Sequence, residues 1–66
     1  MRVVVNGEAR DLGESTSVAD LLASLALQPR RVAIELNRAI LPRRRYAETR
    51  LNEDDALEIV TLVGGG

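Results

Sequence analysis

The first apolar positions of the chain alternate as they do in a β-strand. Met1, Val3 and Val5 share one face of the segment, and the run ends at Asn6-Gly7. Asn-Gly is a strong hairpin signal, because both residues tolerate the positive φ angles that a tight turn requires. We therefore predict a hairpin whose second strand covers about residues 9–12.

The next segment changes to a helical spacing. Its apolar positions recur at i, i+3, i+4 and i+7: Val18, Leu21, Leu22 and Leu25. Ser17 precedes Asp20 by three residues, which resembles a capping box and predicts that the helix begins there. Because a residue before proline avoids the α conformation, we expect the helix to end near Gln28-Pro29.

The rest of the chain predicts three more strands, at residues 31–37, 39–41 and from 56 to about 63. Pro42 stops the second of these. The segment 43–55 lacks a clear period and predicts a long connection with one helical turn around 46–49. Its acidic stretch, residues 53–55, reads as a turn, because calcium loops space their ligands differently.

One helix among five strands covers only one face of a sheet, so we predict an α+β domain with a mixed sheet of four to five strands. The first and last strands lie parallel at its centre if the hairpin and helix form the crossover. That arrangement is the β-grasp. The predicted core is Val3, Val5, Leu12, Val18, Leu21, Leu22, Leu25, Ile34, Leu57 and Ile59.

Composition excludes most autonomous chemistry. The 66 residues contain no cysteine and no histidine, which removes disulfides, thiolate chemistry, the commonest general base and the commonest metal ligand. We expect no catalytic residue and no metal site. The formal net charge of −1 disfavours nucleic acid as a partner. Without a long apolar run or a signal-peptide pattern, we expect a cytoplasmic protein that does not enter membranes.

Two surface features remain as candidates. If Leu57 and Ile59 face the helix, Val60 and Leu62 face the uncovered side of the sheet, where they form either a docking patch or ordinary apolar surface. The basic residues 43–45 could steer an acidic partner or contact RNA, although a solvated loop is the simpler reading.

Residues 32–66, "VAIELNRAILPRRRYAETRLNEDDALEIVTLVGGG", together with "VNGE" and "TSVADLL", resemble the ThiS family of sulfur carriers in thiamine biosynthesis. The resemblance covers essentially the whole chain and implies a ubiquitin-like β-grasp fold. It also implies three partners. An adenylating enzyme of the ubiquitin-activating type uses ATP and magnesium, a donor such as a cysteine desulfurase supplies sulfur, and thiazole synthase receives it.

The same resemblance implies that the site is the C-terminus of the chain. The carboxylate of Gly66 would become an adenylate and then a thiocarboxylate, and the absence of cysteine leaves no thiol to carry sulfur instead. Gly64 and Gly65 would let the tail enter a narrow partner channel. We therefore predict a domain over residues 1–63, a flexible tail over 64–66, and partner docking through Val60, Leu62 and Val63.

Three other functions remain open at this point. The small subunit of molybdopterin synthase is a similar sulfur carrier, although that family commonly has proline shortly before its tail. A ubiquitin-like modifier would end similarly, but this chain has no lysine on which to link to itself. A non-covalent binding module would not need a free glycine end.

Overall fold

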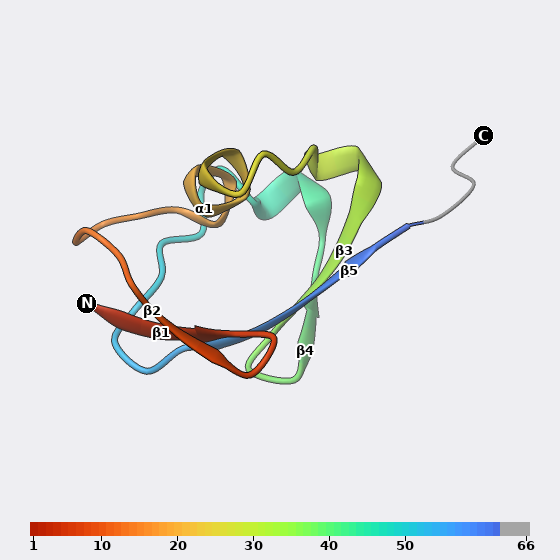
Figure 1. Cartoon of the computed structure of the whole chain (residues 1–66). Helices are drawn as coiled ribbons and strands as arrows, with labels where there is room; N and C mark the ends of the chain where they lie inside the picture. The colour runs from red at the N-terminus through yellow and green to blue at the C-terminus, as the bar shows by residue number, and fades with distance from the viewer. Residues whose placement is uncertain (63–66) are drawn as a thin grey trace.

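The sheet and its single α-helix form two layers in the computed structural model, which describes residues 1–62 (Figure 1). Within these residues the strands are β1 (Arg2–Val5), β2 (Glu8–Asp11), β3 (Val32–Leu36), β4 (Ala39–Leu41) and β5 (Ala56–Thr61). The helix is α1 (Val18–Ser24), and two short 3-10 helices are η1 (Pro29–Arg31) and η2 (Arg43–Arg45). Every predicted strand is present, with bounds that differ by at most two residues.

The strand order is β2-β1-β5-β3-β4, with β1 and β5 parallel and all other neighbours antiparallel. The last strand therefore lies in the middle of the sheet, between the first strand and the third. Helix α1 covers one face of the sheet and leaves the other open (Figure 1). This is the predicted α+β architecture, a ubiquitin-like β-grasp with a mixed five-stranded sheet.

Strand β5 is held by side-chain hydrogen bonds as well as by backbone pairing with its neighbouring strands. Its parallel pairing with β1 ends at Val5 and Leu57. Beyond that point the Asn6 side chain continues the pattern: Ile59 N donates to Asn6 Oδ1 (2.7 Å), and Asn6 Nδ2 donates to Ile59 O (3.1 Å). Asn6 itself has φ of 51°, the left-handed conformation expected of the Asn-Gly turn.

The start of α1 has the predicted capping box. Asp20 N donates to Ser17 Oγ (3.0 Å), and Ser17 N donates to Asp20 Oδ2 (3.1 Å). The pKa of the Asp20 carboxyl lies below its usual value. The largest cause is the hydrogen bond from the Ser17 backbone, and the second is the hydrogen bond with the Ser17 side chain. Two otherwise unpaired N–H groups at the helix start are thereby satisfied.

Replacing Ser17 with alanine is expected to lower the free energy of unfolding by about 1 kcal/mol, the usual loss for such a cap. The pKa of Asp20 is lower in the folded state than in the unfolded state. The Asp20 carboxylate therefore adds to the free energy of unfolding above the unfolded-state pKa, and this contribution is lost as the pH falls through the folded-state pKa. The stability gap between the parent chain and Asp20→Asn should therefore narrow below about pH 4. Urea denaturation across pH measures both effects, with the exposed Ser24→Ala as control.

The prediction that α1 ends near Gln28-Pro29 is wrong, because the helix ends at Ser24. Leu27 N donates to Leu22 O (2.9 Å) and Ala26 N to Ala23 O (3.0 Å), while Ala26 has φ of 59°. This is a Schellman C-cap with alanine at the left-handed position. Glycine or asparagine normally occupies that position, so the sequence did not indicate the end of the helix.

The core lies between α1 and the covered face of the sheet. Its buried apolar residues are Val3, Val5, Val18, Leu21, Leu22, Val32, Ile34, Tyr46, Leu51, Leu57 and Ile59. The predicted core residues Leu12 and Leu25 are only partly buried and pack against its margin. Each follows directly after the end of an element, β2 or α1, where the regular spacing no longer decides burial.

Three core residues were not predicted: Val32, Tyr46 and Leu51. The last two lie in the aperiodic segment 43–55. The helical turn predicted around 46–49 is present as the hydrogen bond from Thr49 N to Arg45 O (3.0 Å), and the 3-10 helix η2 lies directly before it. Backbone hydrogen bonds hold this segment beside α1, from Ala19 N to Tyr46 O (3.1 Å) and from Leu51 N to Thr16 O (2.9 Å). The segment closes the core from one side, so its apolar residues are buried without any period.

Candidate functional site

The open face of the sheet carries the large apolar side chains that the core does not use. Among the described residues these are Ile40, Val60 and Leu62, which are 79%, 58% and 42% exposed. Val60 and Leu62 were predicted on this face. Ile40 was not singled out, although its position between Ala39 and Leu41 on the short strand β4 places it on the opposite side from its neighbours.

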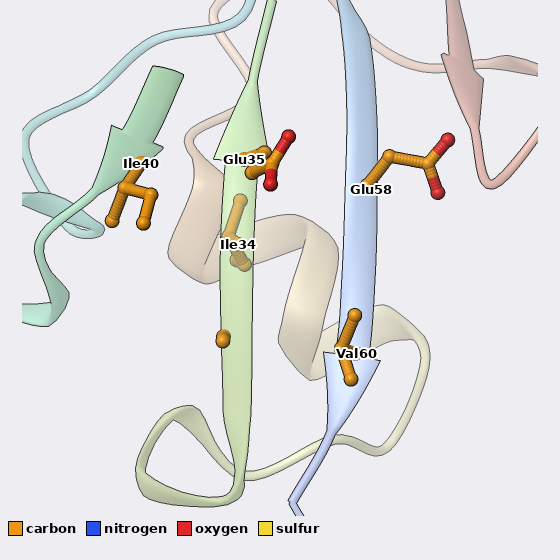
Figure 2. Close-up of a pocket in the computed structure, with 6 residues that line it drawn as sticks. Ile34, Glu35, Ile40, Glu58 and Val60 are labelled. Atoms are coloured by element: carbon orange, nitrogen blue, oxygen red, sulfur yellow. The ribbon is translucent and has the colours of Figure 1, made fainter. Parts of the chain in front are cut away.

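A shallow groove of about 90 Å³ crosses this face over strands β3, β4 and β5 (Figure 2). Its lining residues are Ala33, Ile34, Glu35, Ile40, Glu58 and Val60. Ile34 is almost completely buried and contributes to the floor of the groove, while the other side chains stand at its walls. Apolar groups and two carboxylates thus meet within a few residues of the end of β5.

Register explains which groove residues lie together. Ala33 pairs with Val60, and Glu35 pairs with both Ile40 on β4 and Glu58 on β5. Like charges directly opposite each other are unfavourable in a sheet. Figure 2 shows the Glu58 carboxylate turned away from Glu35, which lessens the repulsion. The two glutamates remain solvated on the open face.

The end of β5 leads from this groove towards the predicted tail. Val32 pairs with Thr61, and Leu62 N donates to Arg31 O at 2.7 Å, so β3 and η1 hold the strand as far as Leu62. Val63 and the three predicted tail glycines, Gly64, Gly65 and Gly66, lie outside the described residues. Their roles, and the boundary between a domain 1–63 and a tail 64–66, remain predictions.

The acidic stretch 53–55 has a structural explanation. Asp55 accepts from Asn52 N (2.8 Å) and from Asn37 Nδ2 (3.0 Å), and Glu53 Oε1 accepts from Arg2 N (3.0 Å). These hydrogen bonds stabilise the turn that precedes β5. Within residues 1–62, no three histidine, cysteine, aspartate or glutamate side chains gather as a metal site would require.

The basic residues of η2 have separate surroundings. Arg45 lies 3.8 Å from Glu48 in an exposed ion pair, whereas Arg43 Nη2 donates to Arg30 O (3.4 Å). Tyr46 directly follows η2, and the residue is 4% exposed. Burial raises the pKa of the Tyr46 phenol, and the nearby positive charge of Arg43 partly offsets that increase. The segment is therefore anchored by its tyrosine rather than being a simple solvated loop.

None of the helices in the described part of the chain has the length and apolar character needed to span a membrane.

Comparison with known proteins identifies the family. The sequence pattern of the ThiS family matches residues 3–66. Over 53 residues the chain is 42% identical to the sulfur carrier protein ThiS of Bacillus subtilis, covering 80% of each protein. The crystal structure of the thiamine biosynthesis protein ThiS from Geobacter metallireducens superposes with a TM-score of 0.84 at 35% identity, over the full length of both chains.

A different kind of relative is much longer than this chain. Thiazole synthase of Paramagnetospirillum magneticum is 44% identical over all 66 residues, which are 100% of this chain and 20% of that protein. The chain thus spans about a fifth of the length of the thiazole synthases it matches. With a family match over nearly every residue and a structural match over the whole fold, this chain belongs to the ThiS family.

Proposed function

We propose that the chain carries sulfur as a thiocarboxylate on Gly66 and donates it for formation of the thiazole ring of thiamine. The observation that carries this proposal is the family match, which continues through the glycines to residue 66. The sequence has no cysteine, so it offers no thiol on which sulfur could be carried as a persulfide. The terminal carboxylate is the group that fits the task.

The chemistry requires activation by a partner. A carboxylate oxygen of Gly66 attacks the α-phosphorus of ATP in the adenylating enzyme, and pyrophosphate leaves. The outer sulfur of a persulfide, carried by a donor such as a cysteine desulfurase, then attacks the acyl carbon and displaces AMP, which leaves an acyl disulfide. A partner thiol attacks the donor sulfur of that disulfide, so that the S–S bond breaks, a new disulfide forms between the two thiols, and the thiocarboxylate is released. This chain supplies the carboxylate and slender glycines, while ATP and magnesium belong to the partner. In this proposal none of its own side chains acts as a catalyst, and it binds no cofactor of its own.

The proposed recipient of the sulfur is thiazole synthase. Proteins of that name contain a region similar to this entire chain within a sequence about five times as long. Joining two domains in one polypeptide keeps their sites at a high effective concentration. The existence of such joined relatives supports the idea that this domain delivers its sulfur directly to a thiazole synthase site.

We further propose that the open face near the end of β5 docks these enzymes. Val60 and Leu62 are exposed apolar side chains at and just beyond the end of β5. Val63, also predicted to dock, lies outside the described residues. The groove between Val60 and Ile40 is a depression in this face that a partner side chain can fill. A partner bound here is placed to receive the residues that follow Leu62.

Val60→Asp or Leu62→Asp is expected to weaken binding to the adenylating enzyme or to thiazole synthase at least about tenfold, because the new carboxylate would be buried without a partner. Isothermal titration calorimetry measures the affinities. Ala9→Asp is a matched control, since Ala9 is exposed on the edge strand β2, which strand β1 separates from β5, and Ala9 does not line the groove. Unchanged affinity for both enzymes would exclude this face as the docking surface.

The proposed carrier function is tested by intact mass measurement. The chain ending at Gly66 is incubated with the adenylating enzyme, ATP, magnesium and a sulfur source. We expect a mass gain equal to the replacement of one oxygen atom by sulfur, located by fragmentation at Gly66. Sulfur found at any other residue, or no gain with an enzyme that modifies another ThiS protein, would contradict the proposal.

A further inference from the structure

Three arginines gather where β5 leaves the sheet, and the proposed function does not yet use them. Leu62 N donates to Arg31 O (2.7 Å), which places η1 directly beside the last described residue. Arg43 Nη2 donates to Arg30 O (3.4 Å), which brings η2 to the same place. Residues distant in the sequence thus meet at one point. We call Arg30, Arg31 and Arg43 the tail-base arginines.

Their charges are not neutralised by the described part of the chain. The ion pairs among residues 1–62 join Arg45 to Glu48 and the Met1 amino group to Glu14, and neither includes a tail-base arginine. All three are exposed. The acidic turn of residues 53–55 lies far from this point, beside the start of β5, at the other end of that strand (Figure 1). A chain with a net charge of −1 therefore presents a local positive surface at the base of its tail.

We propose that the tail-base arginines bind an acidic protein surface that borders the channel receiving the glycine tail. The inference rests on the proposed function, because it requires that the tail enter a partner. The position of the tail-base arginines supports this proposal. Any protein that encloses the residues after Leu62 must approach η1, because the Arg31 carbonyl accepts a hydrogen bond from Leu62 N. Guanidinium groups suit such a rim, since they pair with carboxylates in a fixed bidentate geometry.

The same observations favour an acidic protein over RNA. The Glu35 and Glu58 carboxylates stand on the open face, only a few residues from the end of β5, where they would repel a phosphate backbone. Single-stranded nucleic acids are usually bound through exposed aromatic side chains on which bases stack. The one aromatic residue of the chain, Tyr46, is buried. A protein needs no stacking platform, and its carboxylates can be confined to the part of the rim that faces the tail-base arginines, whereas a phosphate backbone carries its charges along its whole length.

The expected consequence is faster and better oriented association. Complementary charge at the rim of an interface acts mainly on the association rate, and salt screens it. The apolar groove and the tail would supply the short-range contacts, while the arginines would turn the correct end of the domain towards the channel. The chemical step itself should not depend on them.

The test uses the triple variant Arg30→Glu/Arg31→Glu/Arg43→Glu. Its association rate constants with the adenylating enzyme and with thiazole synthase are measured by stopped-flow over a series of salt concentrations. We expect a decrease of at least about tenfold at low salt for one enzyme or both. The difference from the parent chain should shrink as the Debye length falls to about 3 Å near 1 M salt. Circular dichroism verifies that the variant is folded.

Two matched variants identify the cause. Arg10→Glu reverses a charge on the exposed edge strand β2, and Arg45→Glu reverses one in η2 that is already paired with Glu48. Both should change the association rate much less than Arg31→Glu alone. If all single reversals had equal effects, net charge and not the tail-base position would explain the result, and the proposal would fail.

The remaining outcomes separate this inference from the carrier function. A folded triple variant with parental association rates for both enzymes would overturn the proposal, even if the parent chain accepts sulfur normally. Sulfur acceptance by the triple variant at saturating enzyme should match that of the parent, and selective loss of that chemical step would contradict a rim role. Tighter binding of the parent chain to single-stranded RNA than to either enzyme, abolished in the triple variant, would show a nucleic-acid surface instead.

Discussion

Deleting Gly66 is expected to abolish sulfur transfer while leaving the domain folded. The last buried residue of the described chain is Ile59, so the variant keeps every residue of the described core. The variant chain still ends in a carboxylate, but that carboxylate would stop one residue short of the ATP α-phosphate and of the sulfur nucleophile. Because an extended chain spans about 3.3 to 3.6 Å per residue, one lost residue is more than a reacting group can tolerate.

Gly65→Val should have a similar effect for a different reason. The acyl group would keep its reach, but a β-branched residue restricts the backbone and widens the tail where a partner channel must close around it. Intact mass measurement after reaction, together with thermal unfolding, separates activity from stability. We expect both tail variants to melt within a degree or two of the parent, since neither alters the described core.

A glycine outside the tail provides the control. Gly13→Ala places a Cβ 3.9 Å from Thr16 Oγ1, an ordinary contact, at a position without positive φ. This variant should fold and accept sulfur normally. Sulfur accepted efficiently by the chain lacking Gly66 would place the acceptor elsewhere and would refute the carrier mechanism.

Leu22→Ala is expected to destabilise the domain by about 2 to 5 kcal/mol, the usual cost of emptying a leucine site in a core. Leu22 is completely buried, on the face of α1 that packs against the sheet. A domain of this length has a total stability of roughly 3 to 10 kcal/mol. The loss therefore approaches the whole stability, and sulfur acceptance should decline only as the unfolded fraction rises.

Urea denaturation measures this loss, and Leu25→Ala is its matched control. Leu25 continues the same apolar stripe in the sequence but is only partly buried at the end of α1. Its replacement should cost clearly less than that of Leu22. Equal losses would mean that the helix packs through a longer stripe than the structure shows, and a loss below about 1 kcal/mol at Leu22 would contradict its place in the core.

The sequence was most informative where local chemistry alone decides the structure. Asn6-Gly7 tolerates the left-handed turn, and Ser17 and Asp20 satisfy the first N–H groups of a helix whatever lies around them. Alternation at period two made it possible to infer which face Leu57 and Ile59 would bury. The candidate tail was also read from residue types, because it depends on glycine and on the absence of cysteine.

Local signals were insufficient where burial depends on distant segments. Tyr46 and Leu51 enter the core because their segment is hydrogen-bonded to the start of α1. Ala26 adopts a left-handed conformation that alanine does not favour by itself. The two hydrogen bonds of the C-cap, from Leu27 N and from Ala26 N, offset that cost, and no pattern along residues 18–29 revealed that they would form.

The sequence by itself determined the five strands, the start of the helix and their order, since each follows from short-range backbone preferences and from the side chains present. Only the tertiary structure decided which surfaces those elements share. Placing β5 between β1 and β3 brings Ile40, Glu35 and Val60 into one groove. The same placement sets Arg31 beside Leu62 and Arg43 beside Arg30. Such neighbours come from strand pairing and turn contacts across long stretches of chain, which no local pattern records.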